Sequence, residues 1–287
     1  MASMRDIKRR KSSIQGTQQI TKAMKLVSTV KLQRAKANAE CSKSYFDCMF
    51  GTVNSILSRV GHVEHKYLLP GKSQKKAVIV ITSNRGLAGG YNSNVVKLVT
   101  RHESWKKEDI VVYAVGNKGR EALVRSGYEM KEVLPEMIEE PTYTEAMQLS
   151  QRLLQSFSED EIGEIYLAYT SFKNTVSQEP KLIKLLPVEP VEQEAAVSQE
   201  QSAIMNFEPE DTEALDMLIP KYIISLIYGA LKEAVASENG ARMQAMDNAT
   251  SNAEEMISDL ALKYNRARQG SITQELTEII AGAEAIG

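Results

Sequence analysis

The chain has 287 residues, of which 43% are hydrophobic and 25% are charged, a composition that suits a globular or helical protein of one or two domains. Its formal net charge of -2 gives no general nucleic-acid signature. No uncharged apolar stretch approaches the roughly 18 residues that a bilayer-spanning helix needs, so we expect any membrane association to go through another protein.

The first predicted element is a helix over about residues 3–58, a stretch that contains no proline. Such a helix would be roughly 80 Å long, which exceeds what a compact domain needs. Its first 36 residues hold ten bases and the single acid Asp6, so one face should be strongly positive, although a solvated coiled-coil face would be charged as well. The apolar residues recur close to a heptad seam, at Ile7, Ile14, Ile20, Met24, Val27, Ala35 and Ala39.

Both cysteines, Cys41 and Cys48, fall on this predicted helix. Their spacing separates them by about 10 Å along its axis, too far for a disulfide. We expect free thiols in a reducing compartment, and the chain's three histidines do not combine with them into a metal set. The basic start of the chain could be mistaken for a transit peptide, but it runs into the helix without a break, so we reject that interpretation.

The middle of the chain, about residues 74–187, alternates short β-branched runs with helical stretches. Strands are predicted at 77–82, 110–115, 165–169 and 182–186, and helices at 94–100, 118–126 and 144–156. Strands and helices in alternation indicate a mostly parallel sheet with right-handed crossovers, a Rossmann-like α/β unit. This unit is too short for two nucleotide-binding halves.

An acidic linker is predicted next, followed by a second long helical pattern from about residue 209 to the end. Pro220 should kink this helix or mark a boundary in it. Much of its apolar stripe is alanine, which permits a close partner, and the equally long N-terminal helix is the obvious one, in antiparallel orientation. The stripe comprises Ile219, Tyr222, Leu226, Ala230, Ala234, Ala241, Ala245, Ala249, Ala253, Met256 and Leu260.

A glycine-rich turn follows the first predicted strand, over residues 83–92, where a dinucleotide or phosphate could sit. The turn lacks the G-x-G-x-x-G spacing and has no Gly-Lys-Ser/Thr. A tight strand-to-helix turn that needs glycine for backbone reasons is the competing interpretation, and it also fits the second glycine turn at Gly116. No Ser/His/Asp, Cys/His or paired-carboxylate arrangement stands out, so we expect the chain to have no catalytic site, cofactor or metal of its own.

The last turns carry the most specific motif in the chain. Ile272, Thr273, Glu275, Glu278 and the pair Gly282-Ala283 fill every fixed position of a short pattern. With these residues the chain resembles the C-terminal signature of the γ subunits of F-type ATP synthases, of bacterial type. Blocks with the order usual in that family extend the resemblance over nearly the whole chain: residues 20–24, 85–87, 207–209, 241–243 and 264–269.

The resemblance implies an α plus α/β fold, in which a long antiparallel coiled coil of the terminal helices carries an inserted Rossmann-like domain. The implied segments are a helix over 1–60, an α/β domain over 74–190, a linker over 191–208 and a second helix over 209–287. It implies a rotor shaft, one per complex, with the α and β subunits, the ε subunit and the c ring as partners and no nucleic acid. The implied location is the cytoplasmic side of a bacterial membrane, reached only through the Fo partners.

Residue by residue, the resemblance implies two groups of partner-binding side chains. Arg268, Gln269 and Thr273 match positions that bind a catch loop of β. Arg242 matches another contact to αβ. The remaining positions implied are Met24, Lys22 and Lys25, near an acidic lever of β, and Phe207 and Glu208, at the c ring and ε. For Arg242 and Arg268 a solvated helix face is the alternative.

Asn84 and Ala88 stand where family members often have Asp and Cys, so we assign them no function.

Two other classes of protein compete with this interpretation. A nucleotide-binding Rossmann enzyme with coiled-coil oligomerisation arms would bind ATP or NAD as an isolated chain. A free coiled-coil scaffold or nucleic-acid tether would self-associate, with a nucleic-acid affinity that falls steeply with salt.

Overall fold

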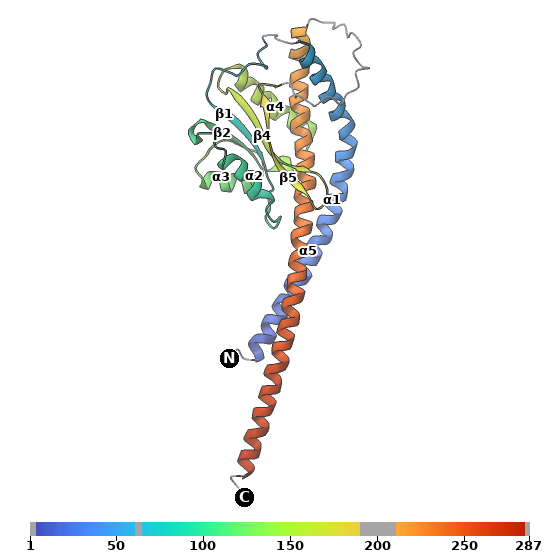
Figure 1. Cartoon of the computed structure of the whole chain (residues 1–287), viewed down its shortest axis with the longest axis vertical. Coiled ribbons are helices and arrows are strands. Elements are labelled where there is room, and N and C mark those ends of the chain that lie inside the picture. The colour runs from blue at the N-terminus through green and yellow to red at the C-terminus, as the bar shows by residue number, and fades with distance from the viewer. Residues whose placement is uncertain (1–3, 61–64, 190–210, 285–287) are drawn as a thin grey trace. The chain divides into compact units, whose positions relative to one another are not determined.

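The computed structural model describes residues 4–60, 65–189 and 211–284. The chain divides into two compact units. The helix-pair unit comprises the two ends of the chain, residues 1–29 and 242–287, and the sheet unit comprises residues 30–241. Helix α1, Met4–Val60, and helix α5, Asp211–Glu284, each contribute one part to each unit (Figure 1). The predicted long terminal helices are confirmed.

The sheet unit contains one five-stranded sheet in the order β3-β2-β1-β4-β5. Strands β1 to β4 are mutually parallel, and β5 runs antiparallel to β4 as the second arm of a hairpin. The strand bounds are Lys76–Ile81 for β1, Ile110–Val115 for β2, Glu129–Val133 for β3, Glu164–Phe172 for β4 and Gln178–Leu186 for β5. The coarse prediction of a central, mostly parallel sheet is confirmed.

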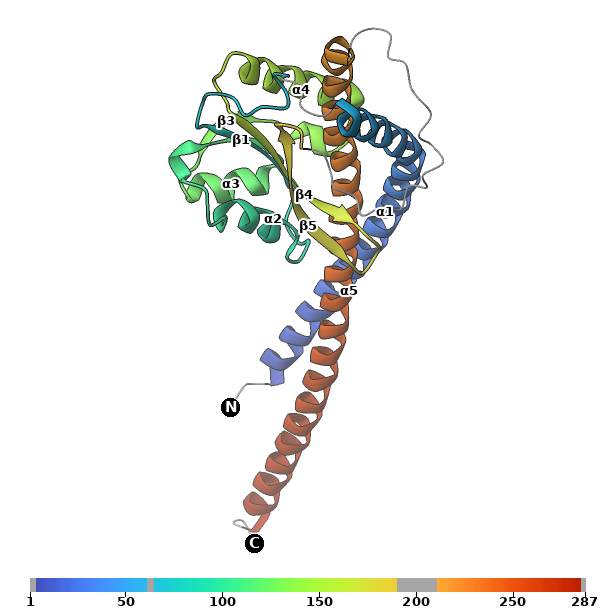
Figure 2. The same cartoon turned by 45° about the horizontal axis from the view of Figure 1, so that its top comes forward.

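Helices cover both faces of this sheet (Figures 1 and 2). Side chains of β1 alternate between the faces: Val78 and Val80 pack with α2 and α3, while Ile79 and Ile81 pack with α4 and the first part of α5. Because both faces are covered, the central strands are apolar at every position, which is why they could be recognised in the sequence. The helix bounds are Tyr91–Thr100 for α2, Asn117–Arg125 for α3 and Tyr143–Ser158 for α4, with short 3₁₀ turns at Lys107–Asp109 and Glu136–Ile138.

Two features of this unit differ from expectation. Strand β3 was not predicted, because it is an edge strand with a charged sequence, Glu-Met-Lys-Glu-Val, and only partial burial. Pro220 does not end α5, which continues through it. Its neighbours Ile219 and Ile223 are fully buried against the sheet, and this packing holds the helix together across the missing backbone donor.

The apolar stripe of α5 divides at the unit boundary. Its first part, from Ile219 to Ala234, packs in the core of the sheet unit, where Val53 of α1 lies in the same cluster. The second part belongs to the helix-pair unit, where its buried members are Ala253 and Leu260. Met256 is exposed there, since the inward positions follow a strict heptad that passes through Ile257 instead.

Candidate functional site: the helix-pair unit

In the helix-pair unit the two chain ends form an antiparallel pair held by three side-chain contacts. Gln18 Nε2 donates to Glu254 Oε1 over 3.0 Å, the Thr21 and Thr250 hydroxyl oxygens are 2.8 Å apart, and Lys25 Nζ lies 2.6 Å from Asp247 Oδ1. As the residue number rises on α1 it falls on α5, so the predicted antiparallel orientation is confirmed. In Figure 1 the red end of α5 runs on past the N-terminus of α1.

Burial within this pair follows a 3.5-residue period, the period of a left-handed coiled coil. On α1 the buried or half-buried positions up to residue 29 include Ile7, Ile14, Thr21 and Ser28, one heptad apart. On α5 the buried or half-buried positions include a series with the same spacing, at residues 246, 250, 253, 257, 260, 264, 267 and 271, and Ala245 and Ala249 are half-buried beside it. The coiled coil expected from the sequence is therefore present, but some of the residues that face inward differ from those predicted.

The heptad seam on α1 does not use all of the apolar residues that the sequence suggested. Ile20 is 62% exposed and Val27 is 58% exposed, while the adjacent hydroxyl residues Thr21 and Ser28 are buried. The regular seven-residue spacing from Ile7 and Ile14 passes through these two polar residues, and a search for apolar side chains alone overlooks them. Ile20 and Val27 instead face away from the pair.

The last turns of α5 have apolar side chains that nothing in the described part of the chain covers. Ile272, Leu276, Ile279 and Ile280 are all exposed, and every described residue from 272 to 283 is exposed as well. Large apolar side chains at helical spacing on a surface mark a place where another protein binds. This end of the chain therefore has the character of a docking segment.

The residues expected at partner contacts are distributed along this unit. Lys22 is exposed and Met24 is half-buried, while Lys25 is occupied by its ion pair with Asp247. Arg242 is half-buried, at the first position of the unit on α5. Arg268, Gln269 and Thr273 lie together on the exposed last part of α5, where the backbone oxygen of Thr273 accepts a hydrogen bond from Thr277. Phe207 and Glu208 fall outside the described residues, as does the linker.

The two cysteines can be followed only in part. Cys48 is exposed and unpaired, in agreement with the expected free thiol. Cys41 lies on α1, but its side chain is not among those described. Among the described residues, no group of three His, Cys, Asp or Glu side chains is placed to hold a metal ion.

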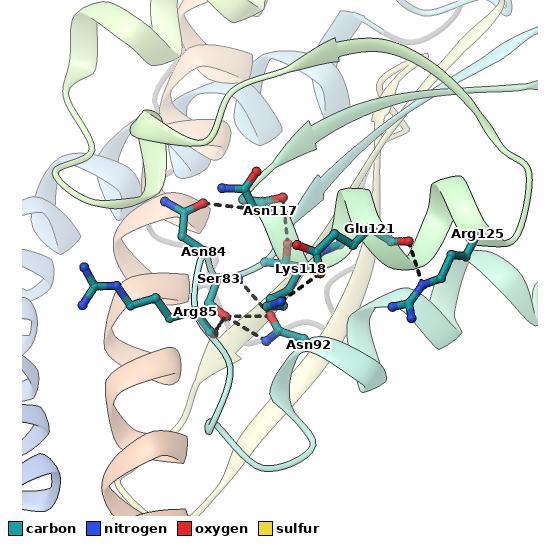
Figure 3. Close-up of polar contacts among 11 residues, drawn as sticks. Ser83, Asn84, Arg85, Asn92, Asn117, Lys118, Glu121 and Arg125 are labelled. Atoms are coloured by element: carbon teal, nitrogen blue, oxygen red, sulfur yellow. Dashed lines mark hydrogen bonds and ion pairs between the residues drawn. The ribbon is translucent and has the colours of Figure 1, made fainter. Parts of the chain in front are cut away.

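Three polar side chains of the glycine-rich turn after β1, Ser83, Asn84 and Asn92, are hydrogen-bonded within the chain (Figure 3). Asn92 Oδ1 accepts from the Ser83 backbone N–H at 2.9 Å, and the Ser83 hydroxyl donates to the backbone oxygen of Arg85 at 2.6 Å. The Arg85 side chain extends to the other side of the loop from Lys118, which pairs with Glu121 at 2.8 Å. These contacts favour the interpretation as a structural turn over that as a phosphate cradle.

Asn84 joins three segments of the sheet unit at this turn. Its amide nitrogen donates to the backbone oxygen of Pro135 at 2.6 Å and its amide oxygen accepts from the Asn117 backbone N–H at 3.0 Å. It thus provides a hydrogen-bond acceptor at the start of α3, where helix N–H groups lack partners. The neutral amide fulfils both the donor and the acceptor role, which gives Asn84 a structural function that the sequence alone did not reveal.

The second glycine turn is also a matter of backbone geometry. Gly116 has φ +95°, and a Cβ at this position would come within 2.1 Å of the Thr82 backbone oxygen. Strands β1 and β2 and the start of α3 therefore meet too closely for any side chain at Gly116. This confirms the backbone interpretation of the second turn.

A polar cluster ties the segment after α1 to the start of α5 within the sheet unit. Asp216 Oδ1 lies 2.9 Å from Lys66 Nζ and 3.3 Å from His65 Nε2, the latter without hydrogen-bond alignment. His65 is buried, and its Nδ1 accepts from the Tyr67 backbone N–H at 3.3 Å. The hydrogen bond from Lys66 lowers the pKa of Asp216 and, in return, raises the pKa of Lys66.

One helix of the described chain, α5, contains a stretch long and apolar enough to cross a membrane by length and composition alone, and 56% of that stretch is buried within the protein. Most apolar side chains from Leu215 to Leu231 lie in the core between α5 and the sheet, while Met217 is exposed. Packing against the sheet accounts for this apolar stretch.

A family model described as ATP synthase matches residues 3–286. The chain is 65% identical to an ATP synthase gamma chain of Lachnoclostridium phytofermentans, with all of both chains covered. It is 43% identical to one of Alkaliphilus metalliredigens, with 99% of this chain and 98% of the relative covered.

Solved structures agree on the fold. A chain in the mitochondrial ATP synthase of Euglena gracilis, OSCP/F1/c-ring, matches with TM-score 0.69 and 20% identity over 99% of this chain and 94% of that one. A chain in the central stalk and c ring of the Tetrahymena thermophila enzyme matches with TM-score 0.58 and 24% identity, over 80% of this chain and 99% of that one. The chain belongs to the ATP synthase gamma chain family.

Proposed function

We propose that this chain is the central rotor shaft of an F1Fo ATP synthase, in which it couples rotation of the c ring to conformational cycling of the catalytic β subunits. The observation that carries the proposal is the likeness to ATP synthase gamma chains over the full length, at 65% and 43% identity. The chain is then a non-catalytic subunit of the complex. The alternative of a nucleotide-binding enzyme is not favoured, since the polar side chains of Asn84 and Asn92 in its candidate turn are hydrogen-bonded within the chain.

The proposed mechanism works through shape and not through a reactive group. Proton flow turns the c ring and the chain with it, and the asymmetric shaft favours a different conformation in each of the three β subunits in turn. One charge crossing 100 mV is worth about 2.3 kcal/mol, so several protons for each ATP place a load on the order of 10 kcal/mol on the shaft. A two-helix coiled coil with a defined register suits this load better than a single helix.

The partners in this proposal are the α3β3 hexamer, the ε subunit and the c ring, with one copy of the chain per complex. Arg268, Gln269 and Thr273 would bind the catch loop of β, and their exposure on the last part of α5 supports this role. Arg242 would contact αβ. Lys22, Met24 and Lys25 would face the acidic lever of β, with the cation of Lys25 shared with Asp247. Phe207 and Glu208 would face the c ring and ε.

The proposal includes the finer organisation and location of the chain. The α/β segment, residues 74–190, would be a Rossmann-like domain, supported by four parallel strands with helices on both faces. The linker would cover 191–208, and the terminal helices 1–60 and 209–287. As part of a membrane-associated complex, the chain would lie peripherally on the cytoplasmic side of a bacterial membrane.

Replacing Met24 by Lys tests the proposed placement of α1. The added cation would stand opposite the acidic lever of β, so proton-coupled ATP synthesis should fall while co-purification with α and β is retained. The matched control is Gln15→Lys, which adds the same charge at an exposed position earlier on α1 and should leave coupling unchanged. Normal coupling in the Met24 variant would contradict the placement.

A further inference from the structure

The seam of the helix-pair unit contains little that would select one alignment of its helices by apolar packing. Among the described residues of α1 in this unit, the two that are fully buried are Thr21 and Ser28. Across from them α5 buries Met246, Thr250, Ala253 and Leu260. Small side chains and a flexible thioether pack almost equally well after a shift of one turn, so apolar contact specifies the register weakly.

The hydroxyl groups supply what the apolar contacts lack. The Thr250 hydroxyl lies 2.7 Å from the Met246 backbone oxygen, the Thr21 hydroxyl lies 3.0 Å from that of Gln18, and the two hydroxyls are 2.8 Å apart. A continuous chain of polar atoms therefore runs from a carbonyl of α1 to a carbonyl of α5 through a buried part of the seam. This chain of atoms has three oxygen–oxygen contacts, and the two threonine hydroxyls have one proton each. Either threonine can therefore donate the hydrogen bond between them.

Two further pairs extend this contact by one helical turn on either side. Gln18 bonds Glu254 and Lys25 pairs with Asp247, so the three contacts form a ladder across the two helices. A shift of one turn, about 5.4 Å, would break all three together. It would also leave the Thr21 hydroxyl in the buried seam near Met246 or Ala253, which offer it no comparable side-chain partner.

We propose that Thr21 and Thr250, with the Gln18–Glu254 and Lys25–Asp247 pairs beside them, are positioning residues that fix the register of the two helices under load. The register matters mechanically if the chain is the rotor shaft proposed above, because torque makes the two helices of a coiled coil slide along each other. The hydroxyl pair contributes specificity and not net stability. A buried polar pair that is replaced on both sides by apolar groups of the same shape costs little.

Disulfide trapping in the full-length chain tests this proposal. With Cys41 and Cys48 replaced by Ser, the pair Gln18→Cys/Glu254→Cys reports the native register, and Gln18→Cys/Ser258→Cys reports a shift of one turn. Both pairs remove the Gln18–Glu254 contact equally, so each is compared between a seam that keeps Thr21 and Thr250, called the native seam, and a seam carrying Thr21→Val and Thr250→Val. Cross-linking rates under mild oxidation are read by gel mobility. In the native seam the shifted pair should cross-link slowly, because its Cα atoms are too far apart.

The valine seam should raise the cross-linking rate of the shifted pair about tenfold, which corresponds to about 1.4 kcal/mol of lost preference. Thr17→Val, which removes an exposed hydroxyl bonded only within α1, should leave the rate unchanged. Serine at both positions keeps the hydroxyls and should keep the native register. An unchanged rate in the valine seam, a serine seam that behaves like valine, or a valine variant that unfolds would each overturn the proposal.

Cross-linking is read on the chain alone and again in the complex with α and β. A chain that fails to assemble contradicts the rotor proposal, whereas the ratio of the two cross-links answers the register question in either case. The two inferences can therefore fail separately.

Discussion

The sheet unit and the helix-pair unit use apolar residues in opposite ways. In the sheet unit, strand β2 is buried along its entire length, and helices cover both faces of the sheet. In the helix-pair unit, hydroxyl residues occupy the buried seam on α1, while Ile20, Val27 and the isoleucines near the end of α5 are exposed. The sheet unit thus has the core of a self-sufficient domain, whereas the helix-pair unit keeps its apolar surface available to other proteins.

The largest effect on the free energy of unfolding is expected from shortening a side chain in the core of the sheet unit. Leu149 of α4 is fully buried in the core between the sheet and its helices, so Leu149→Ala should lower the free energy of unfolding by about 2–5 kcal/mol. Val124→Ala, at an exposed position of α3, should change it by no more than about 0.5 kcal/mol. Urea unfolding followed by circular dichroism measures both, and equal effects would mean that the sheet core does not dominate stability.

The close approach at Gly116 gives the next largest effect. An alanine there would take a left-handed backbone that costs about 1–3 kcal/mol, and its methyl group would collide with the Thr82 backbone oxygen. Gly116→Ala should therefore lower the free energy of unfolding by at least this amount. Gly86→Ala is the control, since a Cβ at Gly86 meets nothing within 4 Å. A well-folded Gly116 variant of native stability would show that β1 and α3 can separate at this point.

The Lys66–Asp216 contact should give a small, pH-dependent effect in the sheet unit. Its hydrogen bond lowers the pKa of Asp216, so the carboxylate contributes stability above its unfolded pKa and loses it as the pH falls through the lowered folded value. Because both side chains are about half exposed, we expect Asp216→Asn to cost about 0.5 kcal/mol at pH 7 and nothing in strong acid. Urea unfolding at the two pH values tests this, with Glu255→Gln as the control. A cost that persists in acid would assign the effect to packing.

Deleting residues 278–287 should have the smallest effect on stability and a visible effect on assembly. The described side chains removed are exposed, Ile279 and Ile280 among them, and Glu278 bonds Gln274 on the same helix, so the unfolding of the sheet unit should not change. Binding to α and β should weaken without being abolished, as co-purification and reconstitution can measure. An unfolded sheet unit would contradict the independence of the two regions.

The sheet unit and the helix-pair unit also differ in how much of each could be predicted from the sequence. Strands β1, β2 and β4 and helices α2 to α4 were predictable, because burial on two faces requires continuous apolar runs and the covering helices are amphipathic. Strand β3 was missed, because an edge strand needs little apolar character. The antiparallel helix pair was predictable from length and the small residues on α5.

The residue content of the seam was not predictable in the same way. Ile20 and Val27 look like core residues, and Thr21 and Ser28 look like surface residues, until the partner helix is placed. Only the seven-residue spacing from Ile7 through Ile14 gave a signal for the two hydroxyl residues. The role of Asn84 depends on Pro135 and Asn117, which lie far from it in the sequence and reach it only through the fold.

Single-molecule rotation tests the central claim most directly. The chain, with its native cysteines replaced and one new cysteine at the exposed Ser126 of the sheet unit, would be assembled with α and β fixed to a surface and would carry a bead on that cysteine. The account predicts that ATP drives the bead round in one direction, with steps that match the three β subunits. ATP hydrolysis by the assembled complex while the bead stays still would contradict it.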